Sequence, residues 1–337
     1  MDKENSGIHQ GRLLWVDIAK CIAILLMVIG HEVNDLSTLH VIIFSFHMPL
    51  FFILSGYTSS RVSNWQKFFK KLQKNFIHVW ILAVIMIIML GIENLIFLKE
   101  FSFSSFCQSV FKGVVWGSNI PAIGLMSVGV MWFLFVFFWA KLLFDVLQIY
   151  LPDIGIGIVL FIASAISYIC CNNFKNYLPQ AFDIVPFAAL FMWMGLVARK
   201  IASQKVSNTW IRWIVGIALL YWIICIMLHL NIEMSIRHYP LFVVTLIEAA
   251  AGTLLVCLLS KWLVLFGFSR VFRIIGQHTL AVMCIHHLDL FWTNWGAYIH
   301  SWPLAAVLRL IIDLLLLCMF LGVKRVFEYK HISIKNS

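Results

Sequence analysis

Charged side chains are scarce in this sequence. Lysine, arginine, aspartate and glutamate make up 12% of the 337 residues, whereas about a quarter of the residues in an ordinary soluble domain are charged. Hydrophobic residues reach 62%, and the mean hydropathy is +0.94. A soluble protein of this length could not cover its surface with so few polar groups. The composition therefore excludes that class and indicates a membrane protein that crosses the bilayer several times.

The sequence also lacks the spacings that hold metals or disulfide frameworks. Its eight cysteines are scattered through apolar segments without a CxxC pair, which predicts small buried apolar side chains. The twelve histidines show no HxxxH or HxxE spacing, so we expect no metal. No internal repeat is visible, which argues against an inverted-repeat transporter. A cleavable signal pattern is missing too, so the first apolar segment is expected to be a retained helix.

Ten segments are apolar and long enough to be predicted as membrane-spanning helices. They are 13–34, 39–59, 76–98, 123–147, 154–172, 182–199, 210–230, 239–259, 273–294 and 303–323. These segments predict an all-α fold, a polytopic membrane helix bundle of about ten transmembrane helices, formed by a single integral membrane domain over 1–337.

The positions of lysine and arginine support this count and predict the orientation. With the N-terminus inside, 19 of the 25 basic residues fall in inside segments, 4 fall in outside segments, and Lys20 and Arg309 lie within helices. The positive-inside rule expects such a split, so both termini are predicted to be cytoplasmic. The net charge of +10 then reflects orientation and contact with anionic membrane lipid. No motif indicates a nucleic-acid partner.

The first predicted helix carries ionisable residues that are unusual in a membrane segment. Such residues are rare in membrane helices and often mark functional sites; here they are Asp17, Lys20, His31 and Glu32. At 100° per residue, Lys20 and His31 share one helix face about 16 Å apart, and Asp17 belongs to the same stripe. Asp17 and Lys20 can also neutralise each other as an i,i+3 pair. A salt bridge that pins the helix is therefore the alternative interpretation for these two residues.

The second predicted helix and the loop after it also contain polar signals. His47 and Pro49 lie inside an apolar stretch, where proline is expected to kink the helix, and Ser55 lies near the predicted cytoplasmic end. Four lysines follow within eight residues, namely Lys67, Lys70, Lys71 and Lys74. This basic loop indicates either contact with lipid headgroups or attraction of a polyanionic ligand such as a nucleotide-containing cofactor.

Together these motifs resemble the acyltransferase-3 family of integral membrane acyltransferases, most closely its branch of fucose 4-O-acetylase-like sugar and polysaccharide O-acetyltransferases. The family's basic residue and histidine in the first helix match Lys20 and His31. The signature Phe-His-Met-Pro-Leu-Phe-Phe…Ser-Gly-Tyr matches residues 46–57. Weaker matches follow in order at Trp132-Phe133-Leu134, Pro186-Phe187, Gly195-Leu196, Arg199, 276–280 and Ile285-His286. One departure is at 75–80, where the family often has Pro-Tyr.

The resemblance implies acyl transfer across a membrane, which we expect to be the bacterial cytoplasmic membrane. Acyl-CoA, usually acetyl-CoA, would be the cytoplasmic co-substrate, and the acceptor would be a hydroxyl of a glycan or lipid-linked sugar at the outer face. His31 is implied as the general base, since an unperturbed imidazole pKa of about 6.5 suits proton transfer at neutral pH; a covalent acyl-histidine is the alternative. Glu32 would orient His31, and His47 or Ser55 would donate to the oxyanion.

The remaining polar residues receive supporting roles. Predicted contacts with acyl-CoA are Lys20, Asp17, Lys67, Lys70, Lys71 and Ser55. Predicted contacts with the acceptor are Trp132, His278 and His286. We expect Arg309 and Asp313 to pair at i,i+4, and Glu248 and Asp183 to serve bundle packing. His287 and Asp289 are expected at the membrane interface. A second copy of the chain is a further candidate partner.

Two other classes of protein would share this topology. One is a transporter or flippase of a glycan or an amino acid, which would not need His31. The other is a membrane domain related to that of membrane-bound serine racemases, which carry a soluble racemase domain after it. This chain ends about a dozen residues after its last predicted helix, so we expect no such soluble domain within it.

Overall fold

The structure is a computed structural model that describes residues 8–9, 12–97, 102–122, 127–204, 207–266, 269–292 and 298–336. This part of the chain is predominantly helical, which confirms the all-α prediction. Two strands of two residues each, β1 (Ile8–His9) and β2 (Arg12–Leu13), form a short antiparallel pair before the first helix. The contacts divide the chain into two compact units. Unit 1 comprises Met1–Ile43 and Leu259–Ser337, and unit 2 comprises Phe44–Leu258.

Unit 1 brings the two ends of the sequence together. Its elements, besides the strand pair, are α1 (Leu14–Gly30), η5 (Val264–Phe266), α12 (Ser269–Gln277), α13 (Thr279–Trp292) and α15 (Trp302–Asn336). Helices α2 (Thr38–Phe44) and α11 (Phe242–Leu263) connect unit 1 to unit 2 along the chain. Within unit 1, α1 packs against α12, α13 and α15.

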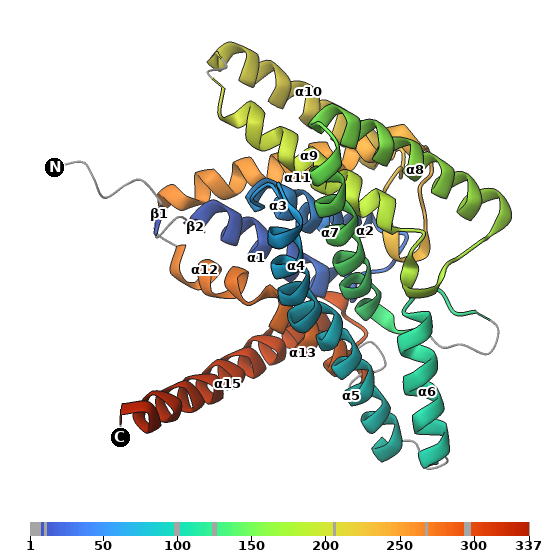
Figure 1. Cartoon of the computed structure of the whole chain (residues 1–337), viewed down its shortest axis with the longest axis vertical. Helices are drawn as coiled ribbons and strands as arrows, with labels where there is room; N and C mark the ends of the chain where they lie inside the picture. The colour runs from blue at the N-terminus through green and yellow to red at the C-terminus, as the bar shows by residue number, and fades with distance from the viewer. Residues whose placement is uncertain are drawn as a thin grey trace. The chain divides into compact units, whose positions relative to one another are not determined.

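Unit 2 contains most of the long apolar helices. They are α3 (His47–Thr58), α4 (Trp65–Asn75), η1 (Phe76–Trp80), α5 (Ile81–Phe97), α6 (Phe103–Trp116), η2 (Gly129–Met131), α7 (Trp132–Tyr150), α8 (Asp153–Phe174), η3 (Pro179–Ala181), α9 (Val185–Ala202), α10 (Asn208–Met227) and η4 (Met234–Ile236). Helix α9 packs against α3, α7 and α8. Helices α5 and α6 lie side by side (Figure 1).

Eight described segments are long and apolar enough to cross a membrane. They are Thr38–Thr58, Trp65–Ile96, Gly129–Tyr150, Asp153–Phe174, Pro179–Ala202, Asn208–Met227, Phe242–Leu263 and Trp302–Phe327. Only 11% of the apolar window of α10 is buried, and 28% of that of α8. Apolar faces exposed on this scale are stable only against lipid. The protein is therefore a polytopic membrane helix bundle; the cytoplasmic position of both termini stays a prediction.

The other two predicted spans form shorter helices. Helix α1 has 17 residues, and the segment 273–294 contains parts of two helices, α12 and α13, separated at His278. These two predicted membrane spans contain the ionisable residues Asp17, Lys20, His286 and Asp289, so they include polar side chains among the apolar ones. Residues 98, 123–126 and 293–294 of the predicted segments lie outside the described residues.

Two local features interrupt the regular α-helical pattern. The predicted span 39–59 is divided into α2 and α3 at Ser45–Phe46, where Pro49 cannot bond to, and clashes with, the carbonyl four residues before it, as the sequence predicted. At the departure from the family pattern, residues 75–80, helix α4 continues into α5 through a π-helix, Phe76–Trp80. A π-helix widens the turn by one residue, so it changes the direction in which α5 leaves without a proline.

Three glycines of the family-like motifs allow helices to touch backbone to backbone. A Cβ on Gly56 of α3 would lie 1.8 Å from the Met192 carbonyl oxygen of α9, and one on Gly195 of α9 would lie 1.9 Å from the Ile53 carbonyl oxygen of α3. In unit 1, a Cβ on Gly276 of α12 would lie 1.8 Å from the Asp17 carbonyl oxygen of α1. Small residues at helix crossings are the membrane solution to close packing. These motif glycines therefore have a packing role.

Candidate active site

His31 stands at the C-terminal end of α1. Its backbone N–H donates to the Met27 carbonyl 3.2 Å away, and its φ and ψ are helical. Helical geometry therefore continues to His31, so Lys20 and His31 share one face of α1. The His31 side chain is exposed. Its ring stacks on that of His286 from α13, with 5.3 Å between the ring centroids and 27° between the planes. We call these two rings the imidazole stack.

His286, the second ring of the stack, is held by a side chain of helix α15. His286 Nδ1 lies 3.0 Å from Asp313 Oδ2 of α15, and neither side chain is more than 1% exposed. The bond fixes the orientation of the ring, and with Asp313 ionised Nδ1 is the donor, because a carboxylate only accepts hydrogen bonds. The sequence placed His286 near the acceptor but did not anticipate Asp313 as its partner.

A buried ion cluster lies in the same unit. Arg309 of α15 forms ion pairs with Glu32, which follows His31, and with Asp289 of α13, its Nη1 lying 3.1 Å from Asp289 Oδ2. We call these three residues the Arg309 cluster. Arg309 contacts these two other carboxylates and Asp313 contacts His286, while the Arg309 charge also acts on Asp313, its expected i,i+4 partner. Asp289, which the sequence placed at the membrane interface, is buried against other side chains at 3% exposure.

Arg309→Met should destabilise the protein strongly. It leaves the buried Glu32 and Asp289 carboxylates without their shared cation, and removing one partner of a buried pair typically costs about 3–5 kcal/mol. Thermal unfolding in detergent measures the loss. The matched control is Arg61→Met, because Arg61 is 45% exposed where it pairs with Asp153, and such pairs contribute at most about 1 kcal/mol. Equal melting temperatures for the two variants would contradict this assignment.

The predicted stripe of α1 also has partners within unit 1. Asp17 is buried, and its Oδ2 accepts a hydrogen bond from Gln277 Nε2 of α12 at 3.3 Å. This contact lies beside Gly276, where α1 and α12 touch. Lys20 is half-buried. His278 occupies the junction between α12 and α13, and its carbonyl accepts from the Val282 N–H. Asp17 therefore contributes to packing, whatever it does for a ligand.

In unit 2, cations converge at the end of α3. Lys141 Nζ of α7 lies 2.6 Å from Asp145 Oδ1 and donates to Ser59 Oγ at 2.8 Å. Lys71 Nζ of α4 lies 4.0 Å from the same Asp145 oxygen and donates to the Ser60 carbonyl. We call Lys67, Lys71, Lys141, Arg199 and Asp145 the basic cluster. Four positive charges stand against one negative charge there, which makes it a candidate anion site.

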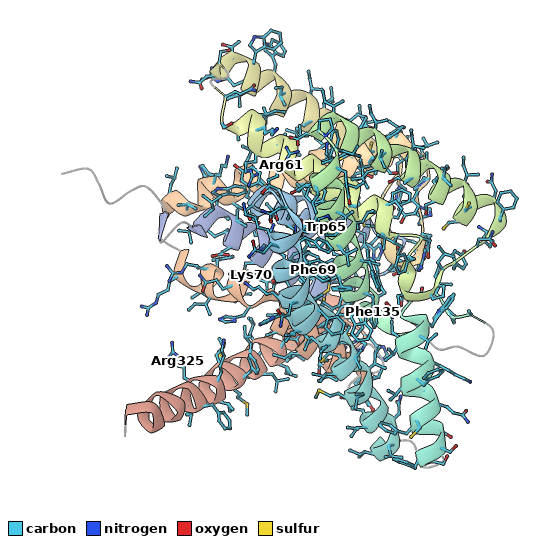
Figure 2. All side chains as sticks on the ribbon, in the orientation of Figure 1. Arg61, Trp65, Phe69, Lys70, Phe135 and Arg325 are labelled. Carbon is cyan, nitrogen blue, oxygen red and sulfur yellow. The ribbon has the colours of Figure 1, made fainter. Side chains whose placement is uncertain are left out.

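Of the three loop lysines predicted to contact acyl-CoA, Lys67 and Lys71 belong to this cluster and Lys70 does not. The charges that act on Lys71 are those of Asp145, Lys141, Arg199 and Lys67. Lys70 is exposed on the same helix, next to Phe69 (Figure 2). Lys141 and Arg199 were not among the predicted site residues. The i,i+4 spacing of Lys141 and Asp145 inside an apolar helix was the signal that could have found the first of them.

The other predicted residues of unit 2 differ in their surroundings. His47 is buried at the start of α3, with its ring 4.7 Å from that of Phe44 in an edge contact. Trp132 is buried at the start of α7 beside Phe133. Ser55 is half-buried on α3, one residue before Gly56. Asp183 pairs with Arg237 at 2.7 Å, as expected of a packing group. Within the described residues, no group of three or more His, Cys, Asp or Glu side chains could hold a metal ion.

These features define an integral membrane protein with an imidazole stack, a buried ion cluster and a separate concentration of positive charge. A family model described as an acyltransferase domain matches residues 13–323. The chain therefore belongs to the acyltransferase-3 family, as the motifs in its first helices indicated, and it is a membrane acyltransferase. A search of curated proteins and a search of solved structures each return no match.

Proposed function

We propose that this acyltransferase is an acyl-CoA-dependent O-acyltransferase of the fucose 4-O-acetylase-like branch, in a bacterial cytoplasmic membrane. It would move an acyl group, acetyl by preference, from cytoplasmic acyl-CoA to a hydroxyl of a glycan or lipid-linked sugar on the outer side. The observation that carries the proposal is His31. The His31 imidazole is exposed at the end of α1, and it stacks on the ring of His286, which is buried and hydrogen-bonded to Asp313.

His31 would act as the general base. It takes the proton from the acceptor hydroxyl while the hydroxyl oxygen attacks the carbonyl carbon of the thioester. The carbon–sulfur bond of the tetrahedral intermediate then breaks, and the imidazolium returns its proton to the departing sulfur of CoA. Glu32 pairs with Arg309, so we assign it to holding the end of α1 rather than to direct proton transfer.

The polyanionic part of acyl-CoA requires positive charge. Lys20 shares the face of α1 that carries His31 and is one candidate contact. The basic cluster of unit 2 is the other, because its surplus of positive charge suits phosphate groups. Its four cations include Lys67 and Lys71, the lysines that the sequence assigned to the co-substrate.

Lys71→Ala should raise the KM for acetyl-CoA about tenfold with little change in kcat, since it removes a charge-assisted contact made equally in the ground and transition states. Initial rates at varied acetyl-CoA concentration measure this effect. Lys74→Ala is the matched control, because Lys74 is exposed on the same helix and is not among the charges that act on Lys71. An unchanged KM in Lys71→Ala would remove the basic cluster from acyl-CoA binding.

Reconstituted vesicles test the proposed function itself. Acetyl-CoA is supplied on the side of the two termini, which are predicted to be cytoplasmic, and cell-surface polysaccharide is supplied on the other side. Free CoA thiol and acetylated polysaccharide are both measured. The proposal expects thiol release that depends on the polysaccharide, and ester formation in equal amount. Movement of glycan across the membrane without thioester consumption would instead identify a transporter.

A further inference from the structure

The buried ring of the imidazole stack has no obvious structural reason to be a histidine. His286 is 0% exposed, and its Nε2 has no hydrogen-bond partner among the described residues. A buried acceptor without a partner costs stability. A phenylalanine could stack on His31 equally well without requiring the buried carboxylate of Asp313. The pair Asp313–His286 therefore points to a role in chemistry rather than in packing.

His286 is not placed to touch a substrate. Its Nε2 has no exposed surface, whereas His31 above it is exposed. The two rings are stacked and their planes differ by 27°, so the π face of His286 lies against His31. Any influence of His286 on the reaction must therefore pass through the His31 ring.

Charged groups from several segments of unit 1 lie around the imidazole stack. The surrounding carboxylates are those of Glu32, Asp289 and Asp313, and the one guanidinium is that of Arg309. Arg309 opposes a positive charge on His31, and it forms ion pairs with Glu32 and Asp289. Asp313 is the carboxylate that bonds to the His286 ring. His40 and His287 are the neighbouring imidazoles of the unit.

We propose that His286, anchored by Asp313, is a positioning residue that stabilises the protonated form of His31 in the transition state. The proposal rests on His31 being the base of the proposed function. When His31 takes the hydroxyl proton, its positive charge develops over the π face of His286. The Asp313 carboxylate, bonded to Nδ1 of that ring, adds negative charge to the pair. Asp313 thus acts on the base through an intervening ring.

The pH–rate profile of Asp313→Asn tests this proposal. Asparagine keeps the shape and can accept the Nδ1–H bond through its amide oxygen, but it carries no charge. A less stabilised imidazolium makes His31 a weaker base. We therefore expect the acid limb of kcat/KM to move about one pH unit lower, with an approximately tenfold lower kcat and an unchanged KM for acetyl-CoA. The assay uses full-length protein in vesicles with acetyl-CoA and cell-surface polysaccharide.

Two further variants keep the outcome interpretable. If Asp313→Asn does not fold, the double variant His286→Phe/Asp313→Asn retains a stacked ring without a buried carboxylate, and the same shift is expected. Glu248→Gln removes another fully buried carboxyl, on α11, and should leave the acid limb in place. A lower rate with an unmoved acid limb would overturn the proposal, because a purely structural role predicts that result.

Failure of this inference can be distinguished from failure of the proposed function. If His31→Ala retains activity, the assignment of His31 as the base fails, and the inference fails with it. If His31→Ala is inactive while Asp313→Asn has the wild-type acid limb, only the role of His286 and Asp313 is wrong.

Discussion

His31→Ala is expected to lose acyl transfer by a factor of about 10² to 10⁴, the usual contribution of a positioned general base. The loss should appear in kcat, because the imidazole acts on the hydroxyl proton in the transition state and holds no part of acyl-CoA in the ground state. CoA thiol release in polysaccharide-loaded vesicles measures it. His31 is exposed at a helix end, so the variant should fold with a melting temperature close to that of the wild type.

The matched control for this substitution is His78→Ala. His78 is also exposed, and its Nδ1 lies 2.8 Å from the Lys74 carbonyl in the π-helix of unit 2. Removing it deletes an imidazole of similar exposure far along the chain, so transfer should remain at the wild-type rate. Thiol release that continues unchanged in His31→Ala would show that another group deprotonates the acceptor, and the catalytic assignment would then be abandoned.

Gly195→Ala should produce the largest loss of stability. The added Cβ would lie 1.9 Å from the Ile53 carbonyl oxygen and 2.8 Å from the Tyr57 nitrogen. Both neighbours are backbone atoms of α3, so helices α3 and α9 must separate to admit a single methyl group. We expect a cost of about 4 kcal/mol or more, the range of severe packing defects. Thermal unfolding in detergent and the yield of monodisperse protein measure it.

Gly216→Ala is the control, with the opposite expected sign. A Cβ at Gly216 of α10 would meet nothing within 4 Å, and alanine is a better helix former than glycine by up to about 1 kcal/mol. Its melting temperature should equal or exceed that of the wild type. If Gly195→Ala melts like Gly216→Ala, the close crossing of α3 and α9 is not present in the folded protein.

The motif glycines show what the sequence pattern can identify and what requires the tertiary structure. Gly56, Gly195 and Gly276 stood out in the sequence only as letters of a family-like pattern. Their reason became visible when each was found facing the backbone of a second helix. Because that second helix can lie more than a hundred residues away, no local rule of helix propensity could identify the contact.

The candidate site likewise combines features that the sequence predicts with features that only the tertiary structure shows. Helix geometry alone placed His31 and Lys20 on one face, and the hydrogen bond from His31 to Met27 agrees with it. The partner of His31 could not be deduced, since His286 is 255 residues away. An i,i+4 rule suggested only Asp313 as a partner for Arg309, because that rule describes an isolated helix surface. In the packed unit, carboxylates from other segments compete for the guanidinium.

By itself, the sequence determined that this protein is a helical membrane protein and an acyltransferase of its family. Those properties follow from apolar run length, scarcity of charge and short motifs, all of which are local. The tertiary structure decided which polar groups meet: the imidazole stack, the anchoring of His286 by Asp313, the Arg309 cluster and the basic cluster. In apolar surroundings an unpaired polar group costs free energy, so such groups are paired in the folded protein. Which groups become partners depends on how helices from distant parts of the sequence pack against one another.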